Sequence, residues 1–440
     1  MREIEFSADD LVSALLNLSK SETICLLDSG GVSNLDSHLL IAGIRPIECL
    51  EISNDDAEKT LAIIDEKFSR QDLSHIYTLS YDFGLKIQNV NSRLKEISTF
   101  DEPDVFFASF DCLIIHDYDT AQTFLTGNEK RFDEIKTLLS ENDEATENGS
   151  ISQSRVSSNF TRQNYIETIE KIQELIRRGD TYQTNLTQRL CAELPENLSP
   201  QRIYLNLRKN NPTAFAAFIK RENDLVISAS PERFFKVQNS TISASPIKGT
   251  RPRGKTAAED LRLRNELLES EKDRAENTMI VDLLRNDLGR VCQFGSIAVE
   301  KLCDLETHPT LFHLVSTING ELRENIKFSE ILKAVYPCGS ITGAPKIRTM
   351  RIIDELETAA RGLSMGAIGC AIPNPAFSVQ RSAFSIFDLS VAIRTMVVKN
   401  QKAVFNVGGG ITIDSVPAEE YEETLVKARA LLNAVNGKLI

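Results

Sequence analysis

Apolar side chains recur at helical spacing in several stretches of the 440-residue chain. One such face consists of Tyr165, Ile169, Ile172 and Ile176. Thr161 is a candidate N-cap for this helix, and Gly179 is a candidate C-terminal stop. The same reasoning predicts three further helices, over 271–288, after Pro345, and from Pro417 towards the C-terminus.

Alternating or continuous apolar runs bounded by turn residues predict strands elsewhere. These runs are Glu22–Asp28, Val105–His116, Thr181–Leu190, Asp224–Ser230, Phe234–Ser243, Phe384–Val398 and Lys402–Ile413, of which the last two are expected to pair. These helices and strands together predict an α+β fold. Its β-sheets should be large, mixed and mostly antiparallel, with helices wrapped around them.

A polar stretch interrupts the pattern at residues 140–158, where the chain reads SENDEATENGSISQSRVSS. So few apolar residues predict an exposed loop or linker. We therefore expect an N-terminal region over 1–140, a linker over 141–158, and a second domain over 159–440.

Net charge, cysteine content and apolar runs indicate which partners and which cellular compartment to expect. The net charge of −13 argues against nucleic acid as a partner, because phosphate binding needs a basic surface. The eight cysteines contain no C-x-x-C pair, which fits reduced thiols in a cytoplasmic protein. The N-terminal residues lack the pattern of a signal peptide, and no apolar run reaches the roughly 18 residues of a membrane span.

The segment Ser245–Gly254, SPIKGTRPRG, reads as a tight loop that holds a lysine between prolines and glycines. Lys248 could be held there as a nucleophile. A surface turn with a solvated lysine is the alternative.

Two pairs of acids stand three residues apart, so each pair shares one helical face. They are Asp273 with Glu276, and Glu420 with Glu423, which Lys427 follows one turn later. Together they could bind Mg²⁺, which takes carboxylate oxygens. Alternatively, acids in a first helical turn complement the helix dipole.

Three segments could bind an anion. Gly408–Gly410 follows an apolar strand, where bare backbone amides could face a ligand, although a bulge or turn is also possible. Arg394 lies among apolar strand residues and needs an anion, either Asp388, another acid or a ligand carboxylate. Ser340 lies in GSITGAPK ahead of a helix, a natural carboxylate site or an ordinary N-cap.

Two titratable residues have a functional and a structural interpretation. His313 in LFHLVST is either a core histidine or a catalytic group. Glu232 in SPERF is either a surface acid or, if burial raises its pKa, a general acid.

These segments also occur in the order typical of a known family. SPERF, SPIKGTRPRG, KDRAENTMIVDLLRNDLGRV, HLVST, PCGSITGAPKIRTMRIIDELE, DLSVAIRT and GGGITIDS with EEYEETLVKA resemble the chorismate-utilising enzymes. Those include the anthranilate synthase large subunit, aminodeoxychorismate synthase component I, isochorismate synthase and salicylate synthase. The resemblance is close from Ser157 onwards and looser before it, through CLLDSGG and YDFG.

Two positions indicate a subgroup within that family. Gln183 stands where water-adding members carry a lysine base, which implies an ammonia-using enzyme. Lys248 stands where anthranilate synthases typically carry alanine, and lysine there is typical of aminodeoxychorismate synthase component I. The resemblance thus implies amination of chorismate at C4 to 4-amino-4-deoxychorismate, for 4-aminobenzoate and folate, through a covalent Lys248 intermediate. The alternative is anthranilate synthase component I, which yields anthranilate and pyruvate.

The resemblance also assigns roles to the other candidates. Glu276 and Glu423 would bind Mg²⁺, with Asp273 and Glu420 nearby, and Glu232 would be the general acid. The expected substrate-binding residues are Gln183, Thr250, His313, Ser340, Arg394, Gly408, Gly409, Gly410 and Lys427. Ammonia would come from a separate glutamine amidotransferase subunit.

The chain departs from the family pattern at two positions. Ser364 replaces an aromatic residue that would line the substrate cleft, and Cys370 replaces a tyrosine. In the N-terminal region, CLLDS resembles a strand that binds tryptophan in some relatives. Ser29 could therefore contact a regulatory ligand.

Overall fold

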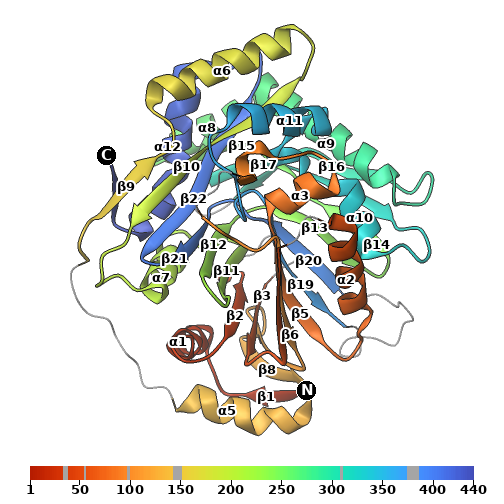
Figure 1. Ribbon diagram of the computed structural model, residues 1–440, viewed down its shortest axis with the longest axis vertical. Helices are drawn as coiled ribbons and strands as arrows, with labels where there is room; N and C mark the ends of the chain where they lie inside the picture. Colours follow the sequence, from red (N-terminus) through yellow and green to blue (C-terminus); the bar gives the residue numbers. More distant parts are fainter. Residues whose placement is uncertain (33–37, 54–55, 97–99, 142–150, 308–310, 374–385) are drawn as a thin grey trace.

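The computed structural model describes residues 1–32, 38–53, 56–96, 100–141, 151–307, 311–373 and 386–440. Two large sheets pack face to face, and helices cover their outer faces (Figure 1). The first sheet holds, in spatial order, β1 (Arg2–Ile4), β8 (Gln122–Gly127), β7 (Cys112–Asp117), β3 (Leu39–Ile44), β2 (Ile24–Asp28), β11 (Phe215–Lys220), β12 (Leu225–Ser230), β21 (Thr395–Lys399), β22 (Lys402–Ile411), β10 (Gln183–Glu193), β9 (Ser154–Ser158) and β23 (Gly437–Leu439), with β18 (Gly343–Ala344) beside β10.

The second sheet is antiparallel throughout its described pairs. Its order is β15 (Ile247–Pro252), β17 (Leu311–Glu321), β14 (Thr241–Ala244), β13 (Arg233–Gln238), β20 (Ile386–Val391), β19 (Ala367–Ile372), β5 (Ser74–Leu79), β6 (Val105–Phe110) and β4 (Glu48–Ile52), with β16 (Ala298–Thr307) beside β17. In the first sheet, β23 and β9 form a parallel pair. These pairings confirm the predicted α+β fold with large, mostly antiparallel sheets.

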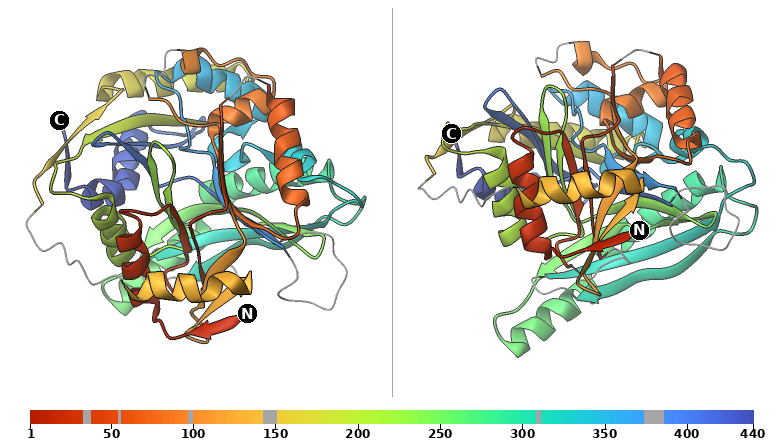
Figure 2. Two further views of the ribbon diagram at one scale, coloured as in Figure 1. Left: turned by 60° about the horizontal axis from the view of Figure 1, so that its bottom comes forward. Right: turned by 90° about the horizontal axis from the view of Figure 1, so that it is seen from below.

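Helices form the two outer layers. Along the first sheet lie α1 (Ala8–Leu18), α5 (Phe132–Ser140), α6 (Arg162–Arg177), α7 (Pro200–Asn210) and α12 (Pro417–Ala434). The others are α2 (Ala57–Ser69), α3 (Tyr81–Ile87), α4 (Arg93–Glu96), α8 (Ala257–Glu269), α9 (Glu271–Gly289), α10 (Phe328–Val335) and α11 (Lys346–Leu356), with short 3-10 turns η1 (Glu129–Arg131) and η2 (Gly339–Ile341). Helix α8 stands away from the body of the molecule (Figure 2).

Three main apolar clusters correspond to these layers. One lies between the sheets and includes Ile76, Phe106 and Val226. The other two lie between each sheet and its helices. The structure is therefore a four-layer helix–sheet–sheet–helix arrangement. No helix in the described part of the chain has the length and apolarity needed to cross a membrane.

The four predicted helices are confirmed. Thr161 caps α6, because its side chain accepts a hydrogen bond from the Asn164 amide, and Gly179 follows the helix with φ +79°. Helix α9 spans Glu271–Gly289, α11 begins at Lys346, and α12 begins at Pro417.

Several strand predictions need correction. Val105–His116 holds two strands, which fits the strand-rich stretch expected there, whereas Phe234–Ser243 forms two strands that a turn separates rather than one. Thr395–Lys399 pairs with β22 as predicted, but Ile386–Val391 belongs to the other sheet. Phe384 lies outside the described residues.

The predicted linker is partly wrong. Ser154–Ser158 forms strand β9, which pairs with β10 and β23, and Ser154 and Val156 are buried. Strands from both sides of residue 150 share each sheet, so the sheets run across the predicted boundary. Residues 142–150 lie outside the described part.

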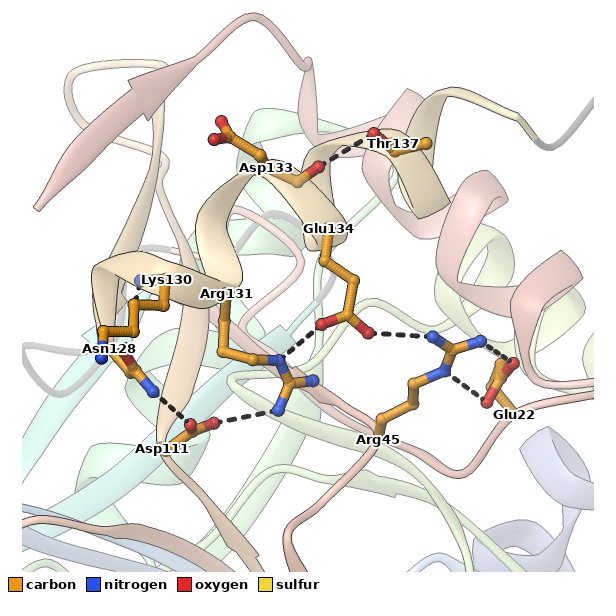
Figure 3. A network of polar contacts seen from close by, with 9 residues as sticks. All are labelled: Glu22, Arg45, Asp111, Asn128, Lys130, Arg131, Asp133, Glu134 and Thr137. Carbon is orange, nitrogen blue, oxygen red and sulfur yellow. Dashed lines mark hydrogen bonds and ion pairs between the residues drawn. The ribbon is translucent and has the colours of Figure 1, made fainter.

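Charged residues tie the N-terminal strands to α5 (Figure 3). Arg45 donates to Glu22 at 2.6 and 2.9 Å and to Glu134 at 2.9 Å. Arg131 donates to Glu134 at 2.8 Å and to Asp111 at 3.2 Å. Hydrogen bonding to Arg45 lowers the pKa of both glutamates, which keeps them charged in this network.

Candidate functional site

Glu232 lies directly after β12 and is buried, with 6 % of its surface exposed. Ser340, in the η2 turn, donates a hydrogen bond of 2.8 Å to its Oε1. Burial raises the pKa of Glu232, while the Ser340 hydrogen bond and the charge of Lys248 oppose that rise. The predicted general acid is therefore a buried carboxyl in contact with Ser340, rather than a surface acid.

Lys248 lies in β15, which is a strand where the sequence suggested a loop. Gly249, with φ +76°, packs so closely on α9 that a Cβ there would lie 2.9 Å from the Cβ of Asp273. This contact brings Lys248 beside the acids of α9. Two residues on, the hydroxyl of Thr250 is 2.9 Å from Nδ1 of His313 on β17. The structure thus brings together Lys248, Thr250 and His313.

The four predicted metal acids share one neighbourhood, and three of them bind other side chains. Asp273 accepts from Arg251 at 3.2 Å, Glu420 accepts from Ser415 at 2.7 Å, and Glu423 pairs with Lys427 at 2.7 Å. No three Asp, Glu, His or Cys side chains among the described residues are arranged to hold a metal ion.

Glu276 differs from the other acids, because its carboxylate forms no hydrogen bond or ion pair within the part of the chain that the structure describes. Burial raises its pKa; the charges of Lys248 and Lys272 oppose that rise, and those of Asp273 and Glu420 add to it. A divalent cation would relieve this crowding of negative charge. Glu276 with its neighbours thus offers the oxygen donors that Mg²⁺ prefers.

Helix α12 brings Glu420 and Glu423 against strand β22. Lys427 donates to the carbonyl of Gly408 at 3.0 Å, and a Cβ on Gly409 would lie 3.3 Å from Glu420. Burial opposes the charged form of Glu423, yet its pKa is lowered, because Lys427, Lys272 and Lys248 favour that form.

The glycine triplet lies within β22, not after it as predicted. Gly410 pairs with Asn185 and Gly408 with Thr187 on β10. A Cβ on Gly410 would lie 1.9 Å from Nε2 of Gln183, so the Gln183 amide occupies this space. Gln183 is buried, and its Oε1 has no hydrogen-bond partner among the described residues.

Arg394 lies between β20 and β21, where the chain passes from one sheet to the other. Asp388 is not its partner, because Asp388 accepts from Arg233 at 2.8 and 2.9 Å. Within the described residues, the Arg394 guanidinium forms no hydrogen bond or ion pair. Burial lowers its pKa, which marks a cation that lacks a counter-ion.

Ser29 and Cys370 line a different space, a cavity of about 420 Å³ between the two sheets. None of Lys248, Glu232 and Arg394 lines this cavity. The Ser29 hydroxyl is buried without a partner in the described part of the chain. Burial raises the pKa of Cys370 to about 12, so its thiol stays protonated. Ser364 lies outside this cavity, and its hydroxyl accepts a hydrogen bond of 3.1 Å from the backbone amide of Asn406.

Sequence reasoning missed two cations at the site. Lys272 lies 3.8 Å from Glu420, and Arg251 bridges Asp273 and Glu266. The signal for Lys272 was its place four residues before Glu276, one turn away on the same helix. Arg251 lies in the same glycine- and proline-rich segment as Lys248.

Comparisons with known proteins agree with this arrangement. Residues 32–433 match a family described as chorismate binding enzyme. Aminodeoxychorismate synthase component 1 of Bacillus subtilis is 35% identical over 369 residues, 81% of this chain and 76% of that protein. Anthranilate synthase component 1 of Acetivibrio thermocellus is 42% identical over 280 residues, 64% of this chain and 54% of that protein.

A solved structure supports the same fold. The anthranilate synthase component I of Streptococcus pneumoniae superposes with a TM-score of 0.79 at 28% identity, over 91% of this chain and 93% of that one. The two relatives named above carry different activities, so similarity alone does not choose between aminodeoxychorismate synthase and anthranilate synthase. The chain belongs to the chorismate-binding enzymes and is a chorismate-utilising enzyme.

Proposed function

We propose that the protein aminates chorismate at C4 to 4-amino-4-deoxychorismate, with Lys248 as the covalent nucleophile. The observation that carries this proposal is the position of Lys248. It lies on a strand packed against α9, where its charge acts on Glu232, Glu276 and Glu423. A primary amine next to a buried acid is the pair that displacement of a hydroxyl group requires.

In the first step, Lys248 loses its proton to solvent, its amine forms a bond to a ring carbon, the ring double bond shifts, and the C4–O bond breaks. Glu232 gives its proton to the departing oxygen, which leaves as water. Ammonia then bonds to C4, the ring double bond moves back to its first position, and the bond to Lys248 breaks. The amine is restored, and the proton lost by ammonia returns to Glu232.

The other residues bind and orient the substrate. Arg394 would pair with the enolpyruvyl carboxylate beside the backbone of Gly408–Gly410, because a partly buried guanidinium without a counter-ion favours such an anion. Glu276 and Glu423 would hold Mg²⁺, and Lys427 would release Glu423 for this purpose. The bound cation would offset the charge of the ring carboxylate. Gln183 would receive ammonia at its unpaired Oε1.

The test is the product formed from chorismate, Mg²⁺ and ammonium at alkaline pH. Mass spectrometry would identify the product, and a coupled assay would measure pyruvate. We expect the mass of 4-amino-4-deoxychorismate and no pyruvate. Anthranilate with one pyruvate per chorismate would refute C4 amination and assign the alternative activity.

That alternative, anthranilate synthase component I, also has support. His313 is buried beside Thr250, close to Lys248, where a base for pyruvate elimination could act. Several relatives also carry the anthranilate synthase name. Lys248 favours the aminodeoxychorismate reaction.

A glutamine amidotransferase subunit would supply the ammonia, by analogy with two-component relatives. Adding a purified amidotransferase of this class should replace ammonium by glutamine as the nitrogen source. No glutamine-dependent turnover with any such subunit would count against this partner.

The inter-sheet cavity would bind an amphipathic regulatory ligand such as tryptophan. Its apolar lining and the unpaired Ser29 hydroxyl suit a ligand with an apolar body and a polar end. Because the chain contains no tryptophan, tryptophan fluorescence of the purified protein would report the bound ligand directly. Cys370→Tyr should fill the cavity and abolish that signal. If the purified wild-type protein shows no tryptophan fluorescence and does not bind added tryptophan, this ligand is excluded.

A further inference from the structure

A fully enclosed ion pair lies beneath the candidate site. Arg361 is 2% exposed and Glu357 is 1% exposed. The pair is bidentate, with Nε donating to Oε2 at 3.0 Å and Nη2 to Oε1 at 2.7 Å. The guanidinium also stacks over the ring of Tyr81, 4.5 Å from its centroid.

The remaining hydrogen bonds of this pair lead to two segments of the site. Arg361 donates from Nη1 to the carbonyl of Ile341 at 2.9 Å, and from Nη2 to the carbonyl of Asn185 at 2.8 Å. Glu357 accepts from both the amide and the hydroxyl of Thr187 at 2.8 Å. Ile341 follows Ser340, while Asn185 and Thr187 lie on β10 after Gln183.

Stability alone does not account for this arrangement. A buried ion pair gains little over apolar residues of the same volume, because desolvation offsets the attraction. A guanidinium differs from other side chains in its rigid planar fork, which fixes several acceptors at set angles. Here the fork spans two backbone carbonyls and one carboxylate, so it sets the position of η2 relative to β10.

We propose that Arg361 is a positioning residue for the C4 amination proposed above, and this inference rests on that function. Through the carbonyl of Ile341, Arg361 holds Ser340 within hydrogen-bonding distance of Glu232. Through the carbonyl of Asn185, it fixes the end of β10 that carries Gln183. Arg361 therefore aligns the general acid with the residue that receives ammonia.

The hydrogen bond between Ser340 and Glu232 affects the pH dependence of the reaction. Glu232 faces Ser340 and the charge of Lys248, and it also acts on the thiol of Cys338. The Ser340 hydrogen bond lowers the pKa of Glu232, so losing that bond raises it. A general acid must be protonated, so kcat falls as pH rises through this pKa. Displacing Ser340 therefore moves the alkaline limb of the kcat profile to higher pH.

The experiment compares Arg361→Lys with Arg221→Lys. Lysine keeps the charge but cannot span both carbonyls. Arg221 is the matched control: it is 3% exposed and bonds Asp224 at 2.5 and 2.9 Å, but it contacts neither η2 nor β10 in any described interaction. Both variants should lose similar stability in urea unfolding.

For Arg361→Lys we expect kcat for chorismate consumption to fall by roughly a hundredfold with little change in KM, as for a misplaced catalytic group. Its alkaline limb should move up by about one pH unit, the equivalent of one lost hydrogen bond. Arg221→Lys should keep the wild-type profile. Equal kcat losses in the two variants, or an unmoved alkaline limb, would overturn the inference.

Two further variants keep the test decisive if Arg361→Lys does not fold. Thr187→Val removes one hydrogen bond to Glu357. It should move the alkaline limb of the kcat profile to higher pH, but by less than Arg361→Lys does. Ser340→Ala should reproduce the full shift, and adding Thr187→Val to it should shift the limb no further, because both act through one hydrogen bond. Additive shifts would refute action through Ser340. A wild-type protein that does not consume chorismate would instead refute the proposed function.

Discussion

A substitution of Arg394 distinguishes a role in substrate binding from a role in stability, because the two roles predict opposite effects. Arg394 carries a partly buried guanidinium without a counter-ion among the described residues, and burial already lowers its pKa. We predict that Arg394→Gln leaves the free energy of unfolding unchanged or raises it by about 1–2 kcal/mol, since an unpaired cation disappears. Without a ligand, this residue opposes folding.

The same substitution should weaken the use of chorismate. A guanidinium bound to a carboxylate through charge-assisted hydrogen bonds contributes about 3 kcal/mol. At about 1.4 kcal/mol for each tenfold change, kcat/KM for chorismate should fall by roughly 150-fold. Because glutamine can still form hydrogen bonds but carries no charge, the fall in kcat/KM measures the contribution of the positive charge.

Arg233→Gln is the matched control. Arg233 and Asp388 have side-chain exposures of 5% and 18%, and removing the arginine leaves a carboxylate without its partner. We expect a loss of about 3–5 kcal/mol in unfolding free energy. Urea unfolding followed by far-UV circular dichroism would compare the two variants. If Arg394→Gln destabilises the fold as much as Arg233→Gln, or keeps normal kcat/KM, the substrate role of Arg394 is wrong.

Three other predictions concern the nucleophile, the acids and a buried histidine. Lys248→Ala should slow product formation by several orders of magnitude in the ammonium-dependent reaction, and near-normal turnover would exclude a covalent lysine. Glu276→Gln and Glu423→Gln should each raise the Mg²⁺ concentration needed for half-maximal rate by about tenfold or more. An unchanged titration would refute their role as ligands. Burial lowers the pKa of His75 from 6.5 to about 4, so the unfolded chain binds more protons between these values. Unfolding free energy should therefore decrease by up to about 3 kcal/mol as pH falls from 6.5 to 4, and His75→Gln should remove this part of the pH dependence, as urea titrations at several pH values would measure.

Local signals predicted the helices well. The apolar face of α6 and its Thr161 cap depend on residues within one or two turns, which the sequence displays directly. Strand β9 escaped prediction because its stability comes from β10 and β23, far away along the chain. The sequence of β15 suggested a loop because Gly249 and the flanking Pro246 and Pro252 are typical of turns, whereas the strand forms by pairing with β17.

The candidate site shows the same division between local and distant information. The acid pairs and Lys248 were visible as residue types at a given spacing. Ion pairs between distant segments were not visible: Asp388 meets Arg233 only through the pairing of β13 with β20. Arg394 has no ion-pair partner among the described residues, and Asp388, the acid nearest to it in sequence, already pairs with Arg233.

The glycine triplet shows how a correct residue choice can have a different cause. The sequence suggested that Gly408–Gly410 was bare so that backbone amides could face a ligand. In the structure, Gly410 must lack a side chain because the Gln183 amide fills that space, and Gly409 leaves room for Glu420 and Lys427. The glycines therefore let side chains from β10 and α12 approach one strand from opposite faces. A substitution at Gly410 would act first on Gln183, so its kinetic effect would report the ammonia binding proposed for Gln183 rather than a carboxylate contact.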